Sequence, residues 1–147
     1  MASWRDGLSD EVQADIDVLY APSLDFAERA LKETRSIHPF GIALTLDDQL
    51  QLHIEEQRSG IQDGTLLVRF AEEMLSDAKE SFKSCALVLD THLPERKTDA
   101  VEMRLEHREG GAIVIQVPYK FSGLRKQLTF GEMIVSSAVP RIWLPTS

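Results

Sequence analysis

The sequence predicts an α+β fold, with an antiparallel sheet of about five strands that carries helices on its apolar face. Apolar and polar residues alternate through 84–120, which is the period of half-buried strands joined by short turns. In 66–82 and in two segments before residue 40, apolar residues recur at threes and fours, which is the helical period. The expected order is helix, helix, strand, strand, helix and three further strands, all in a single domain spanning 1–147.

The two N-terminal helices have recognisable limits. Residues 1–8 are expected to form a loose end, and Ser9 then offers a capping hydroxyl. Acidic residues follow at the positive end of the helix dipole, so the first helix should begin there. The Ala21-Pro22 pair is expected to end it, with a second helix from Ser23 to about residue 36. Pro39 then favours extended geometry and stops helix formation.

A hairpin and a long helix are expected next. Residues 40–46 are almost all apolar and 50–55 alternate after a polar turn, which predicts two paired strands. The apolar stripe of 66–82 predicts a long helix, and we expect this helix to cover the apolar side of the later strands.

The middle strand of the later three, residues 100–108, has one apolar and one charged side. The apolar set is Val101, Met103, Leu105 and His107, and the charged set is Glu102, Arg104, Glu106 and Arg108. A three-residue loop at 109–111 would place Arg108 opposite Ala112 and bring the apolar sides of both strands together. We expect the charged side to face solvent, with a binding groove as the alternative.

Composition and charge limit the function classes. The 147 residues include 24 acidic and 16 basic side chains, a formal net charge of −8, which argues against nucleic-acid binding. The single cysteine, Cys85, excludes an internal disulfide and lies in an apolar strand, so a buried, inert thiol is expected. We find neither a leader nor an apolar run of the roughly 18 residues that a membrane span needs, which favours a cytoplasmic protein without membrane contact.

No catalytic residue, metal site or cofactor is predicted. The four histidines have no chelating spacing, and the chain lacks a nucleophile elbow and a phosphate-binding glycine loop. His107 lies on the apolar side of its strand and is expected to be structural, with a ligand or base as the alternative. Asp90 and Tyr119 each end an apolar strand. The expected ligand-binding residues are therefore His107, Tyr119 and Asp90, in a pocket between the sheet and the first two helices.

The expected order of elements is similar to that of profilin-like and roadblock-like domains. Short motifs also resemble a family of small bacterial proteins of unknown function, over residues 23–143. These motifs are Pro39-Phe40, Asp47-Asp48, Glu106-His107-Arg108, Pro118-Tyr119, Phe130-Gly131-Glu132 and Ile142-Trp143. Members of that family often carry a glycine in the turn where this chain has Asp48 and Gln49. The resemblance implies the fold and brings no activity, cofactor or substrate.

The function expected from the sequence is a non-enzymatic interaction or scaffold module that forms a homodimer. An open antiparallel sheet has unpaired edges that must be covered. Residues 121–147 are expected to form an extended C-terminal segment, in which Ile142 and Trp143 bury at home or in a neighbouring subunit. The expected partner is thus a second copy or another protein. The alternative is a small-ligand sensor or an unrecognised enzyme with a pocket near His107 and Tyr119.

Overall fold

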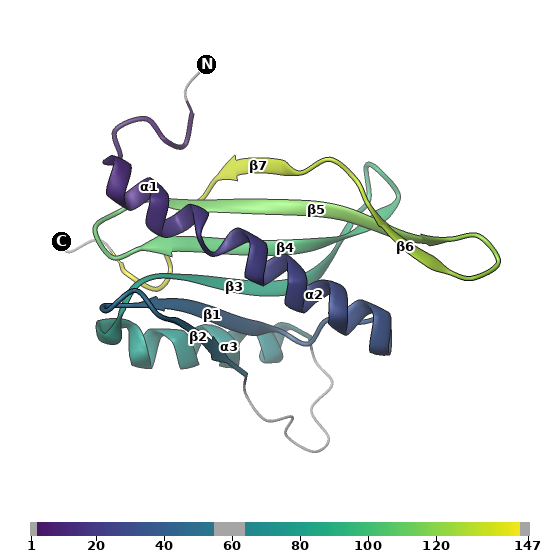
Figure 1. Ribbon diagram of the computed structural model, residues 1–147, viewed down its shortest axis with the longest axis horizontal. Coiled ribbons are helices and arrows are strands. Elements are labelled where there is room, and N and C mark those ends of the chain that lie inside the picture. The colour runs from purple at the N-terminus through teal and green to yellow at the C-terminus, as the bar shows by residue number, and fades with distance from the viewer. Residues whose placement is uncertain (1–2, 55–63, 145–147) are drawn as a thin grey trace.

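The computed structural model describes residues 3–54 and 64–144. Helices α1 (Asp10–Asp17), α2 (Tyr20–Thr34) and α3 (Gly64–Ala78) and the 3-10 turn η1 (Lys79–Ser81) accompany seven strands. The strands are β1 (Phe40–Thr45), β2 (Leu50–His53), β3 (Phe82–Leu93), β4 (Thr98–His107), β5 (Ala112–Ser122), β6 (Gln127–Phe130) and β7 (Ile134–Ser137). They form one antiparallel sheet in the order β2-β1-β3-β4-β5-β6, and β7 also pairs with β5 (Figure 1). The predicted α+β class with an antiparallel sheet is confirmed.

The sheet exceeds the expected count of about five strands, because the chain after β5 folds back onto it twice. Gly123 and Lys126 adopt φ angles of 79° and 51°, which closes a tight turn and lays β6 against the end of β5. β7 pairs with the first half of β5, between Ile113 and Gln116. β6 alternates between polar and apolar residues over four positions only, and β7 is largely exposed without alternation, so neither strand gives a strong sequence pattern.

Helices cover both faces of the sheet, and this corrects the expected position of the long helix. α1 and α2 lie across one face, and α3 lies on the other (Figure 1). Met103 and Leu105 are buried, yet they lie in the core beneath α1 and α2 and not beneath α3. Leu75 of α3 joins a second core with Cys85 and Leu87 of β3. Because β3 is apolar on both faces, each face needs its own cover.

The turn between β4 and β5 consists of Arg108–Gly110, one residue earlier than the expected loop at 109–111. The His107 N–H donates to the Gly111 carbonyl at 3.1 Å, and β5 begins at the next residue, with Ala112 opposite Glu106. Every cross-strand partner differs by two residues from the expected register, so the apolar sides still coincide. The Arg108 N–H donates to the Lys83 carbonyl at 2.9 Å, which holds Arg108 against β3 and outside the β5 ladder.

The N-terminal helices begin near the expected positions. The Ser9 hydroxyl accepts a backbone N–H of the first turn of α1 at 3.1 Å, so the predicted cap is confirmed. α2 begins at Tyr20, earlier than expected, and Pro22 lies in its first turn, where a missing N–H is tolerated. Arg5 forms an ion pair with Asp17 at 2.8 Å, so the segment before α1 contacts that helix.

Gly41 allows α3 to approach the sheet closely. A Cβ atom at this position would lie 2.7 Å from Cδ2 and 3.0 Å from Cγ of the buried Leu75. We therefore expect Gly41→Ala to lower the free energy of unfolding by about 1–3 kcal/mol through overpacking. Urea denaturation measures the change. Gly64→Ala is the control, since no atom lies within 4 Å of the added methyl group; equal stability of the two variants would contradict the close approach.

Candidate functional site

A cavity of about 1010 Å³ opens on the α3 side of the sheet, and we call it the α3 groove. Its walls come from the first half of α3, the segment before β1, strands β3 and β4, and the C-terminal segment. The lining residues are Ile37, His38, Pro39, Gly64, Thr65, Leu67, Val68, Arg69, Glu72, Leu89, Asp90, Arg104 and Arg141. Aliphatic side chains thus share the wall with converging charged groups, which is the composition of a small-molecule site.

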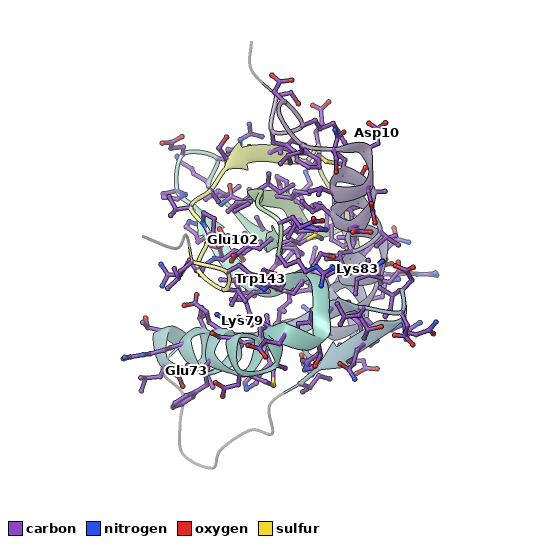
Figure 2. All side chains as sticks on the ribbon, turned by 90° about the vertical axis from the view of Figure 1, so that its left-hand side faces the viewer. Asp10, Glu73, Lys79, Lys83, Glu102 and Trp143 are labelled. Atoms are coloured by element: carbon purple, nitrogen blue, oxygen red, sulfur yellow. The ribbon has the colours of Figure 1, made fainter. Side chains whose placement is uncertain are left out.

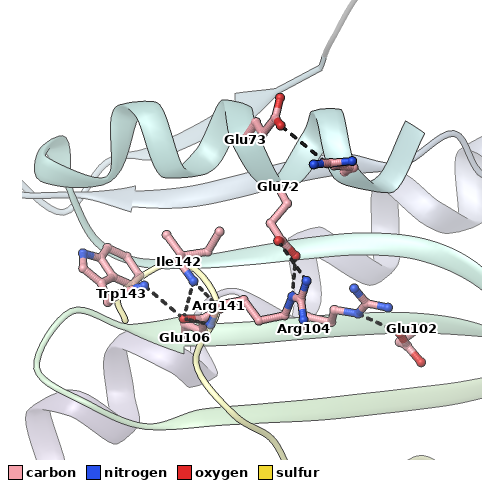
Figure 3. Close-up of polar contacts among 9 residues, drawn as sticks. Glu72, Glu73, Glu102, Arg104, Glu106, Arg141, Ile142 and Trp143 are labelled. Atoms are coloured by element: carbon pink, nitrogen blue, oxygen red, sulfur yellow. Dashed lines mark hydrogen bonds and ion pairs between the residues drawn. The ribbon is translucent and has the colours of Figure 1, made fainter. Parts of the chain in front are cut away.

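A buried carboxylate fixes the C-terminal segment against this face. Glu106 of β4 is 6% exposed and accepts the backbone N–H groups of Arg141 and Ile142 at 3.0 Å and of Trp143 at 3.3 Å (Figure 3). Hydrogen bonds from three N–H groups satisfy a buried negative charge, which is costly without partners. The expectation that the charged side of β4 faces solvent is therefore wrong for Glu102 and Glu106, which are buried, whereas Arg104 is half-buried and Arg108 is exposed.

The C-terminal segment is also tied to α3. The Arg141 guanidinium donates from Nε and a terminal nitrogen to both oxygens of Glu72, at 2.8 and 3.2 Å (Figure 3). Lys79 Nζ donates to the Ile142 carbonyl at 3.3 Å. Figure 2 shows Trp143 and Lys79 on the α3 side of the sheet. Ile142 is 4% exposed and Trp143 is half-buried, so the two expected partner-contact residues pack within their own chain.

Arg104 lies at the centre of the charged part of the groove. Its Nε donates to Glu102 at 2.9 Å (Figure 3). The other oxygen of Glu102 accepts the Gln116 amide at 2.8 Å. The two terminal nitrogens of Arg104 have no hydrogen-bond partner among residues 3–54 and 64–144. Its side chain is 33% exposed and also lines a neighbouring cavity of about 210 Å³. The guanidinium is therefore accessible from the groove.

Two of the three expected ligand-binding residues lie together. The Tyr119 hydroxyl donates to Asp90 Oδ1 at 2.8 Å. Burial raises the pKa of Asp90, and burial together with the Asp90 carboxylate raises the pKa of Tyr119. Asp90 lines the α3 groove, whereas Tyr119 belongs to the core beneath α1 and α2. The pair therefore joins the groove to the opposite core.

His107 is remote from that pair. Asp90 pairs with Val101, and His107 ends the same strand on the order of 20 Å further along. The Glu109 N–H donates to His107 Nδ1 at 3.0 Å, so the neutral ring carries its proton on Nε2. That nitrogen lies 2.8 Å from Asp15 Oδ2 in the core, where it donates. Both ring nitrogens are used within the protein, which suits a structural histidine.

Sequence reasoning did not identify Arg104, Arg141 and Glu72 as site residues. Arg104 alternates with apolar residues and has the pattern of a solvent-facing position. The pairing of Arg141 with Glu72 joins residues far apart in the chain, and no local pattern marks it. The sequence feature that could have indicated this site is β3, which is apolar on both sides. Such a strand requires a packed element on each face of the sheet. Cys85 is buried and burial raises its pKa, in accord with the predicted inert thiol.

Comparisons of this chain with protein-family models, curated proteins and solved structures return no match. The resemblance to small bacterial proteins therefore stays an expectation. Among the described residues, no group of three or more His, Cys, Asp or Glu side chains is placed to bind a metal ion. None of the helices in the described ranges combines the length and apolar character that a membrane span requires.

The attachment of the C-terminal segment can be tested at Glu106. We expect Glu106→Gln to lower the free energy of unfolding by about 2 kcal/mol, because the backbone N–H groups lose a charged acceptor. Urea denaturation followed by Trp143 fluorescence, in a Trp4→Phe background, reports both stability and the position of the segment. Glu95→Gln, in the exposed β3–β4 turn, is the control. Unchanged stability and emission in Glu106→Gln would show that the carboxylate does not hold the segment.

Proposed function

We propose that this chain is a non-enzymatic binding module that takes a small ligand in the α3 groove. The volume of about 1010 Å³ supports this proposal, since small-molecule sites in proteins occupy roughly 300–1,000 Å³. Leu67 and Val68 of α3 and Leu89 of β3 supply apolar wall, and Arg104 supplies an accessible donor. A sensor or carrier needs this combination of apolar area and a few orienting polar groups.

The chemistry of the lining favours binding over catalysis. The described lining contains no serine, cysteine or lysine, and its only hydroxyl and imidazole groups are those of Thr65 and His38. Its two carboxylates already have partners, because Asp90 accepts from Tyr119 and Glu72 from Arg141. The proposed binding site therefore differs from the one expected near His107, because the α3 groove lies on the opposite face of the sheet.

Filling the groove tests this proposal. Leu67→Trp places a larger side chain in the groove wall, whereas Leu66→Trp alters the adjacent, exposed position outside the lining. A library of small organic acids, amines and neutral compounds is screened by thermal unfolding. A bound compound at a hundredfold excess over its Kd should stabilise the wild type by about 2.7 kcal/mol. We expect the same compound to stabilise Leu66→Trp equally and Leu67→Trp far less. A library without a stabilising compound, or equal stabilisation of both variants, would contradict ligand binding in the groove.

A second candidate function is self-association through β2, which forms one edge of the sheet. Leu50 and Leu52 pair with Leu44 and Ile42, so they continue the apolar face of β1, yet they are 50% and 38% exposed. β2 carries no Lys, Arg, Asp or Glu side chain that would oppose pairing with the edge strand of a second copy. Burial lowers the pKa of His53, the last residue of β2. This edge supports a homodimer better than Ile142 and Trp143, which pack within the chain.

Sedimentation equilibrium tests the homodimer. We expect the wild type to be a dimer at micromolar concentration and Leu52→Lys to be a monomer, because a charge on the paired edge opposes association. Leu124→Lys introduces the same charge at a fully exposed position in the β5–β6 turn and should remain dimeric. A monomeric wild type would exclude this association.

A further inference from the structure

We infer that the ligand of the α3 groove is an amphipathic anion whose carboxylate or phosphate group binds the terminal nitrogens of Arg104. This inference rests on the proposed function, since it names the ligand class of the same groove. It follows from the geometry of Arg104, from the pairing of the carboxylates around it and from the apolar wall beside it.

The guanidinium of Arg104 is only partly used. Its single contact with Glu102 is made by Nε, at 2.9 Å. The terminal nitrogens, which form the fork that binds carboxylate and phosphate with two parallel hydrogen bonds, have no partner among the described residues. Arg141 differs, because its Nε and one terminal nitrogen already form a two-point contact with the Glu72 carboxylate.

The neighbouring carboxylates leave room for an incoming anion. Glu102 accepts from Arg104 and from Gln116, and Glu72 accepts from Arg141. The groove lining holds three arginines against two carboxylates, so its local balance is positive although the whole chain has a formal charge of −8. Because the chain as a whole is acidic, it has no long-range attraction for anions, and binding depends on a specific donor within the groove.

The rest of the groove selects the body of the ligand. Arg104 lines both the α3 groove and the smaller cavity beside residues 138–141. Aliphatic residues of α3 and β3, Leu67, Val68 and Leu89, line the remainder. An inorganic ion would leave this apolar area uncovered, whereas an anion with a hydrocarbon portion would bury it.

Three probes with eight carbon atoms each test the inference: octanoate, octanamide and octyl phosphate. Isothermal titration calorimetry measures the Kd of each for the full chain. We expect the better of the two anions to bind at least roughly tenfold more tightly than the amide, because a charged hydrogen bond exceeds a neutral one by that order. Comparison of octanoate with octyl phosphate distinguishes the carboxylate from the phosphate source.

Variants of Arg104 identify the anchoring group. Arg104→Met keeps an unbranched side chain about as long as the aliphatic part of arginine and removes the guanidinium, and we expect it to weaken binding of the preferred anion by roughly 10- to 100-fold while leaving octanamide unchanged. Arg104→Lys keeps the charge without the fork and should give an intermediate Kd. Arg96→Met, at an exposed position of the β3–β4 turn, is the matched control and should bind as the wild type.

The outcomes separate this inference from the proposed function. Equal Kd values for anions and amide, with all binding lost in Leu67→Trp, would retain the groove and overturn the anchoring by Arg104. Wild-type affinity of a folded Arg104→Met for the anion would overturn it as well. Because the comparison of probes on the wild type needs no variant, poor folding of Arg104→Met leaves the inference testable. No binding of any of the three probes would overturn the inference, whereas the proposed function fails only if the library screened by thermal unfolding yields no stabilising compound.

Discussion

The buried carboxylate of Glu106 is the interaction on which the α3 side of the sheet depends. β4 places this charge on a face that would otherwise be open, and the backbone of Arg141, Ile142 and Trp143 surrounds it with N–H groups. A buried charge without partners would destabilise the fold by several kcal/mol, on the order of 3–5. The sheet can bury Glu106 only because the chain returns across this face, and the return places Ile142 in the second core.

The α3 groove is a consequence of how that face is covered. α3 packs closely at Gly41 and Leu75, and the C-terminal segment covers Glu106, so neither element covers Arg104 fully. The space between them retains apolar walls and an accessible guanidinium. On the first face, α1 and α2 close over the alternating apolar side chains of β3, β4 and β5, and the cavity beside the end of α2 is smaller, at about 390 Å³. The binding module that we propose is therefore located on the face with the less complete cover.

Local patterns predicted those parts of the fold that depend on neighbouring residues. The Ser9 cap, the hairpin of β1 and β2 and the alternation of β4 all follow from residues close together in the chain. The side of the sheet on which α3 packs does not, because a stripe such as that around Leu75 fits either apolar face of β3. Nor could the sequence reveal that Arg141 would close over Glu72.

The candidate site was less predictable than the fold, because it is formed by residues that are far apart in the chain. Asp90 and Tyr119 could be singled out because each ends an apolar strand, and the structure brings them together at 2.8 Å. His107 shared their apolar side yet is held by Asp15 from α1, at the far end of β4. The sequence could not identify Arg104 as a site residue, since an exposed arginine and an arginine inside a groove occupy the same position in the alternating pattern of a strand.

Amide hydrogen exchange at the C-terminal segment tests most directly whether this segment covers the sheet. If Glu106 holds it, the amide hydrogens of Arg141, Ile142 and Trp143 will exchange far more slowly than that of Gly123 in the exposed β5–β6 turn. Exchange of all three at the rate of Gly123 would contradict the account, because the second face of the sheet would then lack its cover.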